Sequence, residues 1–201
     1  ITQLVGLQRD GQAVRLSKRT GEMVELTEVV DEVGADAARF TYLLLSVDSP
    51  QTFDLDLVAS QVNENPVFYV QYAHARIHSI VRRADEAGSR RGSPVDANLS
   101  LLVHPRELEI LRALHELPDA VERACRERAP HQVTTWVREM ASSFHGFYHD
   151  CRVLGDGIDP ATTTARLWLV EGARIGLAVA LDLLGVSAPT EMWRDPADGE
   201  D

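Results

Sequence analysis

The hydrophobic positions of this 201-residue chain follow two patterns that divide it near residue 54. The first part holds short apolar runs, at residues 4–7 and 14–16, on either side of Asp10-Gly11, a dipeptide typical of a hairpin turn. After residue 54 we find no convincing strand pattern, and apolar residues recur at helical spacing. We therefore predict a short strand-containing segment followed by an all-helical region.

Two short helices are expected inside the first part. Thr27 is a suitable N-cap for a helix that continues to Val33 and stops at Gly34. Asp36 is expected to cap a second helix over residues 37–45, and Pro50 closes that unit.

The clearest helix opens at Asn65-Pro66, because proline in the first helical turn loses no hydrogen bond. One face is apolar at helical period and should enter the core: Tyr69, Val70, Ala73, Ile77, Ile80 and Val81. A separate stripe interleaves aromatic and basic side chains: Tyr72, Arg76, Ser79 and Arg83. The other flank carries Gln71, His78 and Arg82.

A linker rich in small residues begins at residue 87 and reaches about residue 104. Helices are then predicted over residues 106–117, 119–128 and 131–151, and a last one runs from Asp159-Pro160 to about Leu184. The third of these has a continuous apolar stripe: Val133, Trp136, Val137, Met140, Phe144, Phe147, Tyr148 and Cys151. The last helix is apolar on most sides, which places it at the centre of a bundle. The predicted fold class is therefore mainly α.

Composition narrows the classes of function. A hydrophobic share of 44% is typical of globular proteins, and no stretch approaches the roughly 18 uncharged apolar residues that span a bilayer, so we expect no membrane partner. The net charge of −11 disfavours indiscriminate nucleic-acid binding and leaves room for a local basic face. Cys125 and Cys151 lack metal or redox spacing, which favours a reducing cytoplasm.

The only lysine of the chain, Lys18, lies in a Ser17-Lys18-Arg19-Thr20 loop after a predicted strand. An ammonium on a flexible stem is suited to meeting a phosphate there, and a plain surface turn is the alternative. The stripe of Tyr72 and Arg76 likewise has two interpretations. It is either a solvated helix face or a surface for RNA, with rings for stacking and guanidinium groups for phosphates.

His145 and His149 share a helix face at metal-capable spacing, beside Asp150. The chain lacks the glutamate of the zinc-hydrolase motif and an obvious third ligand, so polar-face histidines are the favoured interpretation. We find no glycine-rich phosphate loop, Ser/His/Asp arrangement or cysteine nucleophile context, and therefore no complete active site in this chain.

The order of the motifs resembles the C-terminal part of a class I arginyl-tRNA synthetase, from about residue 3 to Met192. The resemblance is carried by Arg15-Leu16-Ser17-Lys18-Arg19, Asp36-Ala37-Ala38-Arg39, Phe53-Asp54-Leu55-Asp56-Leu57, the block from Asn63 to Arg76, and Phe144-His145-Gly146-Phe147-Tyr148 running into residues 151–154. The long Asn63-to-Arg76 block is the most specific of these.

This resemblance implies two domains. Residues 1–62 would end a Rossmann-like catalytic domain, and residues 63–201 would form an all-helical DALR anticodon-binding domain with a linker at 87–104 and an acidic tail at 194–201. Ser17, Lys18 and Arg19 would match the second signature loop, which acts on ATP with Mg²⁺. Contacts with tRNA(Arg) would come from the helical domain: Gln71, Tyr72, Arg76, Arg83, Tyr148 and Met192.

The chain departs from the family pattern in three places. Leu16 replaces the usual Met of the signature loop, and Glu191 precedes Met192 where the family commonly ends in Arg-Met. The first signature loop, the arginine pocket and the N-terminal domain are absent, so we expect a fragment that cannot activate arginine alone. We expect a monomer. The alternatives are a stand-alone module that binds tRNA or protein, a metal-dependent enzyme using His145 and His149, and a structural role with Arg76 and Arg83 in buried ion pairs.

Overall fold

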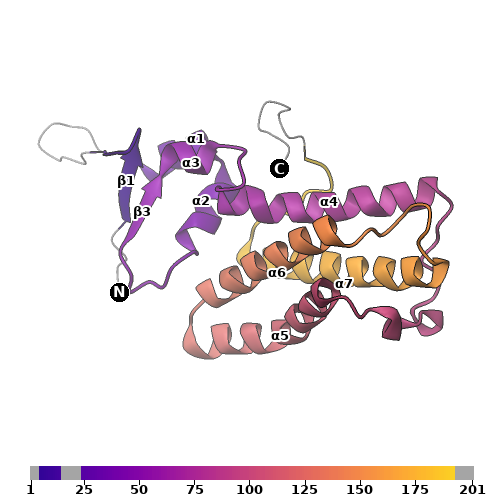
Figure 1. The fold of residues 1–201 in the computed structure, drawn as a ribbon. Coiled ribbons are helices and arrows are strands. Elements are labelled where there is room, and N and C mark those ends of the chain that lie inside the picture. The colour runs from indigo at the N-terminus through magenta and orange to yellow at the C-terminus, as the bar shows by residue number, and fades with distance from the viewer. Residues whose placement is uncertain (1–4, 15–23, 193–201) are drawn as a thin grey trace, which may run out of the picture.

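A computed structural model describes residues 5–14 and 24–192, which form a small sheet with short helices beside a long helical bundle (Figure 1). Strand β1 (Val5–Arg9) pairs antiparallel with β2 (Gln12–Ala13), and β3 (Gln51–Asp54) pairs parallel with β1 on its other edge. Asp10 and Gly11 both adopt positive φ, at 50° and 71°, as a two-residue hairpin turn requires. The predicted turn at Asp10-Gly11 is confirmed, whereas the second strand is Gln12–Ala13 and most of the predicted run at residues 14–16 lies outside the described residues.

Strand β3 was not predicted. It has four residues, of which only Phe53 is apolar, so its alternation is too short to stand out. Its hydrogen bonds come from β1, more than forty residues earlier, with Leu7 opposite Phe53. Both of these side chains are buried, so the strand is stabilised by non-local packing and not by its own sequence.

Three short helices lie beside the sheet, and α3 packs directly against it: α1 (Leu26–Val33), α2 (Ala35–Tyr42) and α3 (Leu55–Ala59). The predicted caps of the first two are wrong. Glu25 precedes α1 and forms a capping box with Glu28, so Thr27 lies inside the helix. Gly34, at φ 85°, both ends α1 and precedes α2, and Asp36 lies in the first turn of α2, where a carboxylate is favoured by the helix dipole.

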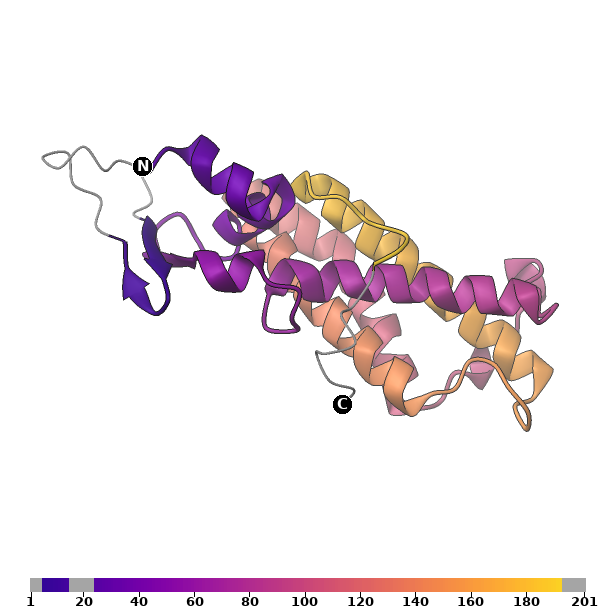
Figure 2. The same cartoon turned by 90° about the horizontal axis from the view of Figure 1, so that it is seen from above.

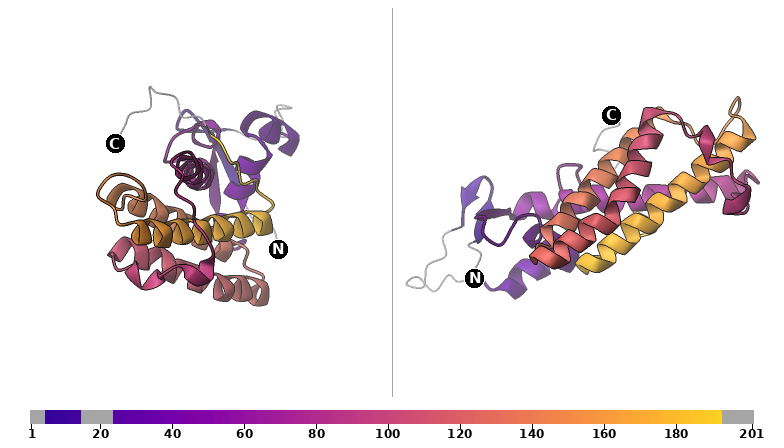
Figure 3. Two further views of the ribbon diagram at one scale, coloured as in Figure 1. Left: turned by 90° about the vertical axis from the view of Figure 1, so that its right-hand side faces the viewer. Right: turned by 90° about the horizontal axis from the view of Figure 1, so that it is seen from below.

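The bundle consists of α4 (Pro66–Glu86), α5 (Pro105–Glu127), α6 (His131–Asp150) and α7 (Pro160–Leu184). Two 3-10 turns, η1 (Pro94–Asp96) and η2 (Leu99–Leu101), lie in the linker. Helix α7 packs against all three other long helices, and the left panel of Figure 3 shows it between α4 and α5. Helix α6 likewise contacts the three other long helices, and Ile175, Val179 and Leu183 of α7 are exposed, so the predicted central position holds only for one side of α7.

Helix α5 corrects one prediction, because a single helix replaces the two expected on either side of Pro118. Proline removes one hydrogen bond from a helix interior, a cost of about 3 kcal/mol. Close packing against α6 and α7 offsets it, with Ala113 and Ala120 buried and the Trp136 indole donating to the Ala113 carbonyl at 2.7 Å.

The core of the bundle is the apolar stripe of α6 together with the buried faces of its neighbours. Ile77, Ile110, Val137, Phe144 and Leu177 are all fully buried, and each such side chain stabilises the fold by about 1.5–3 kcal/mol. One carboxylate is also buried there. Glu107 is 0% exposed and its Oε1 lies 2.6 Å from Nε of Arg166, so an ion pair links α5 to α7.

Within the described ranges, no helix is long and apolar enough to span a membrane.

Candidate nucleic-acid interface

Helices α4 and α6 pack against each other, and an arginine lies between two tyrosines on their shared surface. The guanidinium of Arg76 (α4) lies 4.5 Å from the ring centroid of Tyr72 and 4.3 Å from that of Tyr148 on α6. Its Nη2 also donates to the Tyr72 hydroxyl at 3.0 Å. Two cation–π contacts and a hydrogen bond therefore hold the guanidinium plane in one orientation.

His145 of α6 contacts this cluster and holds Arg76 through a hydrogen bond. Its Nε2–H donates to the Tyr69 carbonyl at 3.2 Å, because a carbonyl can only accept, and its Nδ1 then accepts from Nη1 of Arg76 at 3.4 Å. Burial, together with the charge of Arg76, lowers the pKa of His145 from 6.5 to about 4, against the opposing effect of the Tyr69 hydrogen bond. A neutral imidazole thus orients the arginine without repelling it.

Five of the six predicted tRNA-binding residues line one pocket of about 290 Å³: Tyr72, Arg76, Arg83, Tyr148 and Met192. The α4 residues converge because positions 72, 76 and 83 lie on one face of the helix. Ser79 and Arg82 complete the α4 side, and Glu191 lies beside Met192. The carboxylate of Glu191 pairs with Arg82 at 3.1 Å, which neutralises the acidic residue that departs from the family pattern.

Gln71, the sixth predicted residue, does not line this pocket. It lies on the flank of α4 where its side-chain amide donates to Asp36 and to Ser187. Its position one residue before Tyr72 turns it about 100° around the helix axis. The structure therefore gives Gln71 protein partners in place of an exposed position in the pocket.

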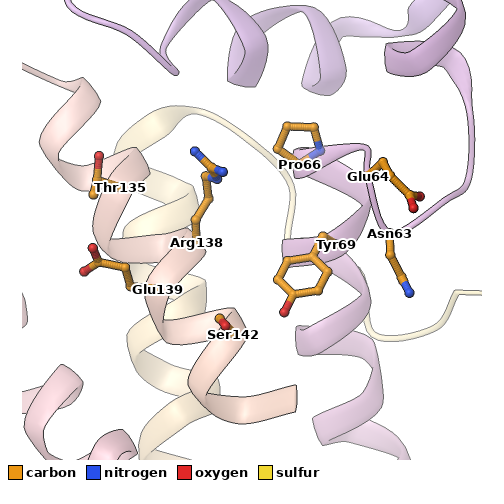
Figure 4. A pocket seen from close by; sticks show the side chains of 8 residues that line it. All are labelled: Asn63, Glu64, Pro66, Tyr69, Thr135, Arg138, Glu139 and Ser142. Atoms are coloured by element: carbon orange, nitrogen blue, oxygen red, sulfur yellow. The ribbon is translucent and has the colours of Figure 1, made fainter. Parts of the chain in front are cut away.

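The pocket continues into a longer groove between α4 and α6. A neighbouring hollow of about 420 Å³ shares Tyr72, Arg76 and Tyr148 with it and extends to Asn63 and Tyr69. Asn63 and Tyr69 in turn border a third hollow of about 530 Å³, where Arg138 projects from α6 across from Tyr69 (Figure 4). The shared lining residues place the three hollows next to one another along α4 and α6, and together they are here called the groove.

The basic residues of the groove differ in whether they are paired: Arg82 forms an ion pair with Glu191, and three others form none with the described residues. Among the described residues, no ion pair is formed by Arg76, Arg83 or Arg138. The alternative in which Arg76 and Arg83 serve as buried ion pairs is therefore not what the structure shows.

The metal alternative lacks a coordination site in the described part of the chain. No group of three or more His, Cys, Asp or Glu side chains there could hold a metal ion. His145 is directed to Tyr69 and Arg76, whereas His149 is 83% exposed and pairs with Asp150 at 2.6 Å.

Ser17, Lys18 and Arg19 lie outside the described residues, so their predicted role stays a prediction. Sequence reasoning missed Tyr69, Asn63 and Arg138 as groove residues, and for His145 it favoured a polar helix face over a metal ligand. A usable signal existed for His145, which lies three residues before Tyr148 and so shares its helix face.

Comparison with known proteins finds a matching protein family. The model of the DALR anticodon binding domain matches residues 70–192. The arginine–tRNA ligase of Frankia alni is 49% identical over 194 residues, and that of Moorella thermoacetica is 48% identical over 192. Each alignment covers 96% of this chain but only 35% and 34% of the relative, so the chain spans about a third of their length.

Solved structures agree with this match. The crystal structure described as a putative arginyl-tRNA synthetase from Campylobacter jejuni superposes with a TM-score of 0.82 at 27% identity, over 96% of this chain and 40% of that one. The Thermus thermophilus arginyl-tRNA synthetase gives a TM-score of 0.67 at 25% identity, over 94% and 35%.

Proposed function

Because this chain belongs to the DALR anticodon binding domain family, we propose that its α4–α6 groove binds the anticodon arm of tRNA(Arg). The observation that carries the proposal is the single pocket formed by Tyr72, Arg76, Arg83, Tyr148 and Met192. All five residues lie within the segment that the family model matches. The relatives named arginine–tRNA ligase supply the identity of the proposed tRNA.

The chemistry of the pocket suits an unpaired nucleotide. Tyr148 is 37% exposed and offers ring surface on which a base can stack, an interaction worth about 1–3 kcal/mol per base. Arg76 is fixed between the two tyrosines, so the edge of its guanidinium is oriented before RNA arrives. Arg83 adds a second cation at the pocket wall for a phosphate.

The rest of the groove supports a strand that continues past this pocket. Arg138 lies ten residues before Tyr148 on α6, about 15 Å along the helix axis, so the two side chains would meet different nucleotides. Hydroxyl and amide groups near Arg138 offer hydrogen bonds to sugar or base: Asn63, Tyr69, Thr135 and Ser142. Glu64 and Glu139 line the same hollow, so a phosphate there would have to lie beside Arg138 and away from these carboxylates.

We further propose that the chain is the C-terminal portion of an arginine–tRNA ligase, which joins arginine to its tRNA with ATP and Mg²⁺. The alignment over about a third of the ligases of two bacteria supports this assignment. Ser17, Lys18 and Arg19 would then supply a cationic loop to the ATP site, where a preplaced charge stabilises the departing phosphates. A stand-alone module that binds tRNA without catalysis is the alternative.

Two experiments separate these statements. The RNA proposal predicts that the purified chain binds a tRNA(Arg) transcript and loses that binding when the anticodon arm is deleted; equal affinity for both RNAs would contradict it. The ligase proposal predicts arginine-dependent pyrophosphate exchange by the longer protein and none by the 201-residue chain. Exchange by this chain alone would show that the ATP and arginine sites are not where we place them.

A further inference from the structure

The segment after α7, residues 186–192, returns along α4 and is here named the strap. Gly185 ends α7 in the left-handed conformation, with φ 66°, which turns the chain back over the bundle. Figure 2 shows the yellow strap running back from the end of α7 to α4. The strap has no helix or strand hydrogen bonds of its own, so side chains of other elements must hold its backbone.

The first anchor of the strap is Ser187, where three segments meet. Asp36 on α2 accepts a hydrogen bond from the Ser187 amide at 3.1 Å and another from the Ser187 hydroxyl. Gln71 on α4 donates from Nε2 to the Asp36 carboxylate and to the Ser187 carbonyl, both at 3.0 Å. Every backbone polar group of Ser187 therefore has a side-chain partner.

Arg39 adds a second anchor one turn further along α2. Its guanidinium donates to the carbonyl of Gly185, at the C-terminal end of α7, where a cation is also favoured by the helix dipole. Asp36 and Arg39 thus hold the residues on either side of Val186, whose side chain is buried at 4% exposure. Together these contacts fix the position at which the strap leaves α7.

Two more contacts continue along α4. His74 donates from Nδ1 to the Pro189 carbonyl at 2.8 Å, and Arg82 pairs with Glu191 at 3.1 Å. The strap is therefore held at alternate residues, 187, 189 and 191, by one flank of the helix. The next residue is Met192, which lines the pocket with Tyr72 and Tyr148.

We propose that Asp36, Arg39 and Gln71 are positioning residues for RNA binding. In this proposal they do not contact the RNA themselves. They fix the strap, so that Met192 already lines the pocket before RNA binds. A free strap would lose conformational entropy each time RNA binds, and anchoring removes that cost from the binding step. The inference rests on the proposed RNA-binding function of the pocket and extends it to residues more than a hundred positions earlier in the chain.

A double-mutant cycle tests the inference on the purified chain with a tRNA(Arg) transcript. Asp36→Ala and Met192→Ala should each weaken binding about fivefold. The double variant should bind no more weakly than Met192→Ala alone, because Asp36 acts only through the strap that carries Met192. Asp36→Asn keeps an acceptor for Ser187 and should restore part of the affinity. Asp156→Ala, which removes an exposed carboxylate from a loop, is the matched control.

Hydrogen exchange of the amides of residues 187–191 gives an independent readout. Exchange there should accelerate in Asp36→Ala and in Gln71→Ala, while the core of α6 stays protected. A fivefold effect of Asp36→Ala that persists in the Met192→Ala background would overturn the inference, as would unchanged affinity with a loosened strap. If Met192→Ala and Tyr148→Ala both leave affinity unchanged, the pocket is not the RNA site and the proposed function fails with it.

Discussion

Replacing Arg76 with alanine should weaken RNA binding and lower the stability of the fold, and the contacts of Arg76 allow the loss of stability to be calculated. In the folded chain Arg76 makes two cation–π contacts, each worth about 0.5–1 kcal/mol, a hydrogen bond to Tyr72 worth about 1 kcal/mol, and a longer, weaker one to His145 at 3.4 Å. The free energy of unfolding should therefore fall by about 2 kcal/mol. Such a loss leaves most domains of this size folded.

The effect on RNA has a distinct signature. Loss of one phosphate contact should flatten the dependence of log affinity on log salt concentration by about 0.7, the value for single strands. Arg76→Lys should keep most of that slope, because the charge remains, yet bind more weakly, because an ammonium does not stack flat between Tyr72 and Tyr148.

Fluorescence anisotropy with a labelled anticodon stem–loop, repeated over a salt series, measures both quantities, and urea unfolding measures stability. The matched control is Arg112→Ala, which removes an exposed arginine of α5 that does not line the groove. A salt slope for Arg76→Ala equal to that of the unsubstituted chain would refute the phosphate contact, whatever the change in affinity.

Three other predictions concern stability and catalysis. The pKa of His145 is about 4 in the folded chain against an ordinary 6.5, so protonation favours the unfolded chain below pH 6.5. The free energy of unfolding should therefore fall by up to about 3 kcal/mol as pH drops from 6.5 to 4. Urea unfolding of His145→Gln should show a weaker dependence of this free energy on pH. Glu107→Gln breaks the buried pair with Arg166 and should cost about 3 kcal/mol in the free energy of unfolding. Glu109→Gln, at an exposed pair, should cost less than about 1 kcal/mol; equal losses would contradict the argument from burial. In the longer protein that we propose, Lys18→Ala should raise the barrier to arginyl-adenylate formation by about 3 kcal/mol without changing tRNA affinity, and an unchanged rate of pyrophosphate exchange would make Lys18 a surface-turn residue.

Features that depend on local spacing could be predicted from the sequence. The helical period placed Tyr72, Arg76 and Arg83 on one face, and the predicted helix start at Asn65-Pro66 and helix end near Leu184 were correct because caps act within one turn. Tyr148 and Met192 were predicted as tRNA contacts only through the family resemblance, because no local sequence pattern indicates that α6 and the residues after α7 pack against α4.

Features that depend on distant partners could not be predicted. Strand β3 needs β1, and the continuity of α5 through Pro118 needs the packing of α6 and α7. Gln71 was assigned to RNA through the family resemblance, whereas its partners Asp36 and Ser187 come from two other segments. For a polar side chain on a helix flank, the sequence alone does not show whether it contacts a ligand or another segment of the same fold.

The most direct test of the central claim is to remove one base from the RNA. An anticodon stem–loop of tRNA(Arg) with a single abasic loop position, moved through the loop in turn, should at one position bind the unsubstituted chain at least about fivefold more weakly, as expected for a lost base stack. At that position Tyr148→Ala should bind the abasic and intact loops equally. If no position weakens binding, or if Tyr148→Ala discriminates as well as the unsubstituted chain, the tyrosine–arginine pocket does not hold a nucleotide.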